Sequence, residues 1–261
     1  MFLSVIIPAY NEEKRLPKTL AEIDKYLKNQ NYDYEIIVVN DGSKDKTAEI
    51  VRDRISNNKN LRLIDNKKNH GKGYVVRQGM LAAIGEHRLF TDADNSTSID
   101  QIEKMWPEFA EASPHLSPRP PLSGSVFEKG FDIVIGSRDV KGAVLDPPQP
   151  FLRNVILGEG FKLFRKIIIG LWRIEDTQCG FKCFTKKTAE NIFPKCKINR
   201  FAFDPEILVI AKKLGYKIKE IPVYWRNDPQ SKVKFKSMVK MGLDLFKIRF
   251  NLIAGKYGKK I

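Results

Sequence analysis

The chain has 261 residues, of which 42% are hydrophobic and 10% aromatic, so it can bury a core and is not an intrinsically disordered chain. Its 46 basic and 31 acidic residues give a net charge of +15, which favours an anionic partner: nucleic acid, a phosphorylated substrate or anionic lipid. The three cysteines lack a C-x-x-C spacing, which argues against disulfides and zinc and for a reducing compartment. The chain has no uninterrupted run of ~18 apolar residues, so no membrane-spanning helix is expected.

The first half of the chain alternates apolar runs with segments of helical spacing. Strands are expected over residues 2–8, 35–40, 61–65 and 87–91. Helices are expected over residues 14–29, 46–55 and 73–85. Because the strands are continuous apolar runs joined by helices, the sequence predicts an α/β fold with a mostly parallel sheet flanked by helices on both faces.

Strand-like sequence resumes after a proline-rich segment at residues 113–125, which predicts a loop inserted in the same domain. Further strands are expected over residues 131–136, 180–184 and 217–223. Helices are expected over residues 101–112, 153–171, 187–193 and 205–214. We therefore divide the chain into one α/β domain, residues 1–230, and a basic C-terminal tail, residues 231–261.

The residues that follow the strands are the candidates for a site, because ligands of a doubly wound sheet bind beyond the carboxyl ends of its strands. The first four strands are followed by residues 8–13, 40–43, 69–73 and 91–95. These segments supply the aromatic ring of Tyr10, several carboxylates, small residues and the cation of Lys72. The set suits a nucleoside diphosphate, because a divalent cation on Asp94 can bridge to the diphosphate while Asp92 serves the ribose.

Each of these elements has a simpler interpretation when it is taken alone. A D-x-D at residues 92–94 is common in acidic turns, and Asp41-Gly42 is more often only a turn. Gly71-Lys72-Gly73 lacks the spacing of a phosphate-binding P-loop. Their recurrence at one edge of the sheet is what favours a nucleotide site over unrelated turns.

Six strings follow one another along the chain: VIIPAYNEE, VVNDGSKDKT, NHGKG, DADNST, IVIGSR and DTQCGFK. In this order they resemble glycosyltransferase family 2, over residues 4–233. The resemblance implies a GT-A nucleotide-sugar-binding fold, a nucleotide-sugar donor, Mg²⁺ or Mn²⁺, and inversion at the anomeric carbon. Within the family, DTQCGFK is most similar to glucosyltransferases that act on dolichyl or polyprenyl phosphate, which implies UDP-glucose. Polyprenyl-phosphate mannosyltransferases, which use GDP-mannose, are the alternative.

The resemblance also implies roles for individual residues on the donor side. The residues implied to line the nucleoside pocket are Pro8, Tyr10, Glu12, Asp41 and Gly42. Lys72 would lie near the nucleotide, Asp92 would touch ribose or metal, and Asp94 would be the principal metal ligand. On the acceptor side, Arg138 would face a lipid phosphate, joined by Arg153. Arg226 and Lys232 are candidates for the diphosphate or the lipid phosphate.

The acceptor decides whether the enzyme needs a general base. A phosphate monoester has its second pKa near ~6, so it is mostly dianionic at neutral pH and needs cations, for which Arg is suited, but no base. A sugar hydroxyl must instead give its proton to a carboxylate, for which Asp176 is the candidate. Asp176 has an alternative interpretation as a structural turn aspartate, so the sequence leaves a sugar or polysaccharide hydroxyl open as the acceptor.

The C-terminal tail combines positive charge with helical periodicity. It carries nine basic residues and one acidic residue, Asp244. The residues of its apolar stripe recur at steps of three and four and are Met238, Met241, Leu245, Ile248 and Leu252. The pattern is typical of a basic amphipathic helix on anionic lipid at the cytoplasmic face of a membrane. The alternatives are a helix packed on the domain and docking to a membrane-embedded partner.

Nucleic acid is not expected as the anionic partner. Aromatic residues are not interleaved with basic ones as a base-stacking platform requires, and no helix-turn-helix or RNP string occurs. The positive charge is therefore assigned to phosphorylated substrates and to a membrane surface.

Overall fold

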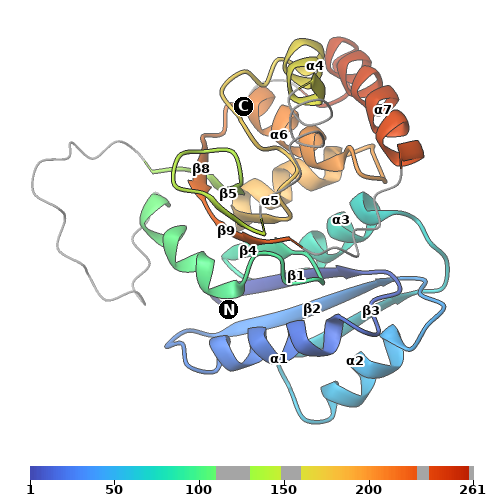
Figure 1. The fold of residues 1–261 in the computed structure, drawn as a ribbon, viewed down its shortest axis with the longest axis vertical. Helices are drawn as coiled ribbons and strands as arrows, with labels where there is room; N and C mark the ends of the chain where they lie inside the picture. The colour runs from blue at the N-terminus through green and yellow to red at the C-terminus, as the bar shows by residue number, and fades with distance from the viewer. Residues whose placement is uncertain (110–129, 148–159, 228–234, 259–261) are drawn as a thin grey trace, which may run out of the picture.

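The computed structural model describes residues 1–109, 130–147, 160–227 and 235–258, with a seven-stranded sheet at its centre (Figure 1). The sheet has the strand order β3-β2-β1-β4-β7-β5-β8. Its strands are β1 Leu3–Ala9, β2 Tyr34–Asp41, β3 Leu61–Asn66, β4 His87–Thr91, β5 Ile133–Ser137, β7 Phe181–Thr185 and β8 Ile218–Pro222. The α-helices are α1 Leu16–Leu27, α2 Thr47–Ile55, α3 Lys72–Ala82, α4 Gly160–Ile169, α5 Lys186–Ile192, α6 Phe203–Leu214 and α7 Phe235–Ile253.

Helices cover both faces of the sheet, because the buried strands present apolar side chains to both. Along β2, Ile36 and Val38 belong to the core on one face, whereas Ile37 and Val39 belong to the core on the other. The first core includes residues of α1, and the second includes residues of α3, α5 and α6. Figure 1 shows the same division, with α1 and α2 on one side of the sheet and α3, α5 and α6 on the other.

The expected mostly parallel sheet is confirmed, with one antiparallel strand that the sequence did not predict. β1 pairs in parallel with β2 and β4, and β5 pairs in parallel with β8. β7 runs antiparallel to both of its neighbours, and its Cys183 lies opposite Leu89 in β4 and Val134 in β5. The carboxyl ends of β1, β2 and β4 therefore meet at one edge of the sheet, where the candidate site was expected.

Two local predictions were wrong. Among the described residues of the helix expected over 101–112, which end at 109, the structure has two short 3₁₀ helices, Ile99–Lys104 and Trp106–Glu108, since Pro107 has no N–H to continue an α-helix. A small parallel sheet of β6 Val144–Asp146 and β9 Tyr224–Arg226 was missed, because three residues are too few for an alternating pattern. The expected loop over residues 113–125, and the helix expected before residue 160, lie outside the described residues.

The apolar stripe of the C-terminal helix faces the protein core. Leu245 and Ile248 are fully buried, and Met241 and Leu252 pack against the same core. For this stripe the structure therefore has the alternative of a helix packed on the domain, and not a stripe that faces lipid. No helix among the described residues is both long and apolar enough to cross a bilayer. The division of the chain at residue 230 stays a prediction, because the junction lies outside the described residues.

A buried ion pair lies beneath the carboxyl edge of the sheet. Lys182 on β7 is fully buried, and its Nζ lies 2.6 Å from Oδ1 of Asp204 in the first turn of α6. The same ammonium group donates a hydrogen bond to the carbonyl oxygen of Cys179 and lies 5.2 Å from the centre of the Phe90 ring. Each charge of such a pair depends on the other, because an unpaired ion in this interior would be strongly destabilised.

We expect Lys182→Met to lower the free energy of unfolding by about 3–5 kcal/mol, because it leaves the Asp204 carboxylate buried without its cation. The double variant Lys182→Met/Asp204→Leu should regain part of this loss, since it removes both charges. Urea unfolding measures both effects. Lys18→Met, which removes an exposed ammonium 3.8 Å from Glu22, is the control and should leave the midpoint unchanged. A single variant as stable as the wild type would contradict this assignment.

Candidate active site

The D-x-D aspartates directly follow β4, and Asp92 is fixed by a cation and by a glycine. Lys72 begins α3, and its Nζ lies 2.5 Å from Asp92 Oδ1. On the other side, a Cβ atom added to Gly180 would lie 2.1 Å from Asp92 Oδ2, so only glycine leaves room for this carboxylate. Residues from three distant parts of the chain therefore meet at one carboxylate.

Lys72 remains charged despite its burial. Burial alone would lower its pKa, but the carboxylates of Asp92 and Asp204 raise the pKa above its ordinary value. The ammonium group thus offsets negative charge at the bottom of the site.

Asp94 has the properties of a metal ligand that lacks a strong cationic partner among the described side chains. Its Oδ1 accepts a hydrogen bond from Ser96 N at 3.0 Å, and its Oδ2 lies 3.9 Å from Arg15 Nη1. Burial and the neighbouring charge of Asp92 raise the pKa of Asp94, so a further cation at this carboxylate would be stabilising.

The two aspartates fit a divalent cation that is shared with a phosphate. Asp92 Oδ1 is buried, and Lys72 is its charged partner among the described residues. Within the described residues, no group of three or more His, Cys, Asp or Glu side chains could hold a metal. One or two carboxylates completed by substrate phosphates are, however, the usual arrangement for Mg²⁺.

The residues expected at the nucleoside pocket lie at the ends of β1 and β2. Tyr10 is exposed directly after β1, whereas Pro8 is buried within that strand. Both carboxylate oxygens of Glu12 bind the guanidinium of Arg15, each at 2.7 Å. Because Arg15 also approaches Asp94, it connects the first loop with the D-x-D.

Asp41 acts on the loop that leads to Lys72. Its Oδ1 accepts a hydrogen bond from His70 N at 2.7 Å, and its Oδ2 accepts one from Gly71 N at 2.9 Å. Gly42 has φ +68°, and an added Cβ would lie 2.6 Å from the carbonyl carbon of Lys68. Asp41 and Gly42 therefore hold residues 68–71 against β2, which positions the start of α3.

On the side expected to bind the acceptor, Arg138 and Asp176 form a nearly buried ion pair. Arg138 donates from Nε to Asp176 Oδ2 at 2.7 Å and from Nη2 to Asp176 Oδ1 at 3.0 Å. The Arg138 side chain is 22% exposed, and its guanidinium lies 4.7 Å from the centre of the Trp225 ring. The guanidinium is thus held in one plane at the surface of the site.

The contacts of Asp176 favour the structural interpretation over a general base. Its Oδ1 also accepts hydrogen bonds from Gln178 N at 2.9 Å and Cys179 N at 3.2 Å. Burial alone would raise the pKa of Asp176, but Arg138 and these N–H groups hold it well below its usual range. A carboxylate that binds protons so weakly is a poor base at neutral pH.

Of the remaining cations, only Arg226 can be located. It ends β9, and its N–H donates to the carbonyl oxygen of Ser96 at 2.7 Å, so β9 lies against the D-x-D loop. Arg153 and Lys232 lie outside the described residues.

Three residues of this arrangement were missed from the sequence: Arg15, Gly180 and Trp225. Arg15 had a weak signal, since it stands three residues after Glu12 in a position to pair with it. Gly180 lies in the string DTQCGFK, but neither its role nor that of Trp225 could be assigned, because their partners Asp92 and Arg138 are distant in the sequence and only the fold brings them together.

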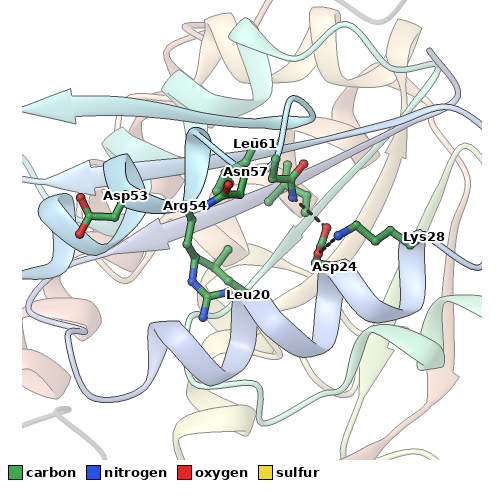
Figure 2. A pocket seen from close by; sticks show the side chains of 9 residues that line it. Leu20, Asp24, Lys28, Asp53, Arg54, Asn57 and Leu61 are labelled. Atoms are coloured by element: carbon green, nitrogen blue, oxygen red, sulfur yellow. Dashed lines mark hydrogen bonds and ion pairs between the residues drawn. The ribbon is translucent and has the colours of Figure 1, made fainter.

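A pocket between α1 and α2 does not contribute to this site. Figure 2 shows its lining, which includes Asp24 of α1, Lys28 directly after that helix, and Arg54 of α2. It also touches Ile36 and Leu61, at the amino ends of β2 and β3. The pocket therefore lies at the edge of the sheet opposite to the D-x-D.

A D-x-D beyond a central strand of a mostly parallel sheet is the arrangement of GT-A glycosyltransferases, and solved structures share the fold. One is glucosyl-3-phosphoglycerate synthase from Mycobacterium tuberculosis in complex with UDP, at 15% identity and a TM-score of 0.61 over 100% of this chain and 81% of that chain. Another is mannosyl-3-phosphoglycerate synthase from Rubrobacter xylanophilus, at 13% identity and a TM-score of 0.65 over 100% and 77%.

Sequence relatives identify the family. Residues 4–117 match Glycosyl transferase family 2. The chain is 40% identical to a dolichyl-phosphate beta-glucosyltransferase of Trichomonas vaginalis, over 95% of this chain and 73% of that protein. It is 34% identical to the human dolichyl-phosphate beta-glucosyltransferase, over 98% of this chain and 77% of that protein. The chain belongs to glycosyl transferase family 2 and is a glycosyltransferase.

We expect Gly180→Ala to lower glycosyl transfer by ~100-fold, because the added methyl group must displace the Asp92 carboxylate and ångström-scale misplacement has this cost. Gly160→Ala, whose added Cβ meets no atom within 4 Å, is the matched control and should keep full activity. Transfer rates and urea midpoints are measured for both variants. Full activity in Gly180→Ala would show that Asp92 need not stay in place.

Proposed function

We propose that the protein transfers glucose from UDP-glucose to dolichyl phosphate or a related polyprenyl phosphate. A phosphate oxygen of the lipid attacks the anomeric carbon, and the bond from that carbon to the UDP oxygen breaks with its electron pair going to UDP. Attack opposite the leaving group converts the α-linked donor into a β-linked product. The relatives that carry the name dolichyl-phosphate beta-glucosyltransferase support this substrate pair.

The observation that carries the proposal is the fixed Arg138 guanidinium beside a carboxylate unsuited to act as a base. A dianionic phosphate acceptor needs a positioned cation and has no proton to lose, whereas a hydroxyl acceptor would need a base. The Arg138–Asp176 pair meets the first requirement and not the second. Arg226, Arg153 and Lys232 are proposed to add positive charge for the lipid phosphate or the diphosphate.

On the donor side, Asp94 and Asp92 would hold Mg²⁺ or Mn²⁺. When bound, the cation would supply Lewis-acid stabilisation of the departing diphosphate. Lys72 would contribute further positive charge through its ion pair with Asp92. The nucleoside is proposed to lie beside the exposed Tyr10 ring, in a frame formed by Pro8, Glu12, Asp41 and Gly42.

We expect Asp94→Ala to abolish metal-dependent transfer while the fold is retained, because it removes the candidate ligand whose ion-pair partner is the more distant, 3.9 Å away against 2.5 Å for Asp92. The assay follows radiolabelled glucose from UDP-glucose into the organic phase with polyprenyl phosphate as acceptor, with and without Mn²⁺. Thermal stabilisation by UDP and Mn²⁺ should disappear in the same variant. Label found only in water-soluble glycan from the wild type would overturn the lipid acceptor.

We also propose that the enzyme is peripheral at the cytoplasmic face of a membrane, docked through α4 and α7. The stripe of α7 that points away from the core is apolar, and its members, 51–72% exposed, are Leu243, Phe246, Phe250 and Ile253. It continues onto α4, whose Leu163 and Ile167 are also exposed and whose Phe164 ring lies 5.7 Å from that of Phe246. Figure 1 shows these two helices side by side.

Charge on α7 favours an anionic bilayer as the occupant of this surface. The exposed cations along and just after the helix are Lys240, Lys247, Arg249 and Lys256. Each basic residue near anionic lipid contributes about 1 kcal/mol, in addition to the burial of the aromatic rings. Three free, buried cysteines agree with a reducing compartment on the cytoplasmic side.

We expect the double variant Phe246→Ser/Phe250→Ser to bind vesicles of phosphatidylcholine and phosphatidylserine at least ~10-fold more weakly, because two rings are lost from the apolar surface. The double variant Leu81→Ser/Ile84→Ser removes two exposed apolar residues at and just after the end of α3 and should bind as the wild type does. Co-sedimentation with vesicles measures both. Equal binding by the two double variants would contradict docking through α7.

A further inference from the structure

Asp176 holds Arg138, and Glu220 in turn holds the backbone of Asp176. Glu220 lies in β8 and places both oxygens of its carboxylate on two successive backbone N–H groups. Its Oε2 accepts a hydrogen bond from Glu175 N at 2.8 Å, and its Oε1 accepts one from Asp176 N at 2.9 Å. The backbone of the residue that clamps Arg138 is thus fixed from the edge strand of the sheet.

The strand register explains why Glu220 can reach this position. β8 pairs in parallel with β5, with Glu220 opposite Ile135 and Pro222 opposite Ser137, the last residue of β5. Arg138 follows directly, and its own N–H donates to Asp176 Oδ2 at 3.1 Å. Two neighbouring strands therefore hold Asp176, one through its backbone and the other through its side chain.

The opposite side of the same segment is held by α4. Arg165 donates from Nη2 to the carbonyl oxygens of Ile174 at 3.2 Å and Glu175 at 3.0 Å. Lys166 Nζ lies 2.7 Å from Glu175 Oε1, and Lys162 Nζ lies 3.1 Å from Glu175 Oε2. These α4 side chains are donors, so they cannot accept hydrogen bonds from the N–H groups of Glu175 and Asp176. Glu220 supplies the acceptors for both N–H groups.

We propose that Glu220 is a positioning residue for the acceptor phosphate, acting through Asp176 on Arg138. The proposal rests on the function proposed above, in which Arg138 binds the lipid phosphate. A guanidinium binds phosphate well only when its fork of donors has the correct direction. Without Glu220 the two N–H groups lose their acceptors, Asp176 shifts, and the plane of Arg138 is no longer fixed.

Glu220→Gln is the informative substitution, because it keeps the shape and brings an amide NH₂ group against a backbone N–H donor. We expect the apparent KM for polyprenyl phosphate to rise at least ~10-fold, while the KM for UDP-glucose stays within about twofold, since misplacement of a positioning group by about an ångström can cost up to 10²-fold. A merely structural role would not separate the two constants.

Glu35→Gln is the matched control. Glu35 is buried, and its Oε1 accepts hydrogen bonds from Ile84 N at 2.8 Å and from the Ser4 hydroxyl at 2.6 Å, while its Oε2 lies 2.9 Å from Arg62 Nη2. It lies near the amino end of β2, at the edge of the sheet away from Arg138. We expect this variant to lose stability without a change in the KM for the acceptor.

A double-mutant cycle tests the route through Arg138. In an Arg138→Ala background, Glu220→Gln should not raise the acceptor KM further, because the group that it positions is gone. Effects that multiply would overturn the proposal, as would an unchanged acceptor KM in Glu220→Gln alone. If Glu220→Gln does not fold, Glu220→Asp enters the same assays, since its shorter side chain cannot reach both N–H groups. A wild type that transfers no glucose to polyprenyl phosphate would overturn the proposed function as well.

Discussion

Repulsion between closely spaced carboxylates is the constraint on which the site depends. Asp92 and Asp94 stand two residues apart after a buried strand, and burial together with the neighbouring charge of Asp92 raises the pKa of Asp94. The fold offsets this charge with Lys72, whose loop is itself fixed by Asp41. The negative charge left at Asp94 is what a cation-bound diphosphate would complement.

Both halves of the site contain an ion pair that fixes a charged side chain, an aspartate in one half and an arginine in the other. On the proposed donor side Lys72 fixes Asp92, and its neighbour Asp94 would be left to bind a cation. On the proposed acceptor side Asp176 fixes Arg138, whose guanidinium would face an anion. Asp176 therefore contributes through the direction that it imposes on Arg138, and not through a proton that it could accept.

The sequence predicted the parts of this structure that are encoded locally. The strands of the first half were predicted to within about one residue, because short apolar segments alternate with helical ones, and their order along the chain located Asp92, Asp94 and Lys72 at one edge. The antiparallel direction of β7 was not predictable, since the apolar pattern of FKCFT is compatible with both parallel and antiparallel pairing. The sequence also could not decide whether Asp176 is a general base or a structural residue that holds Arg138, because Arg138 lies 38 residues away.

The C-terminal helix shows how one sequence pattern can support two surfaces. Its regular stripe through Leu245 and Ile248 is buried against the domain, and the flanking Phe246 and Phe250 form the exposed one. Packing of α7 on α4 joins the exposed stripe to a helix that also holds the segment before Asp176 through Arg165. The proposed membrane surface is thus connected to the proposed phosphate-binding arginine through ring packing between α7 and α4 and through the hydrogen bonds of Arg165. A rigid connection of this kind would keep Arg138 at a constant depth relative to the bilayer, which an acceptor with its phosphate at the membrane surface requires.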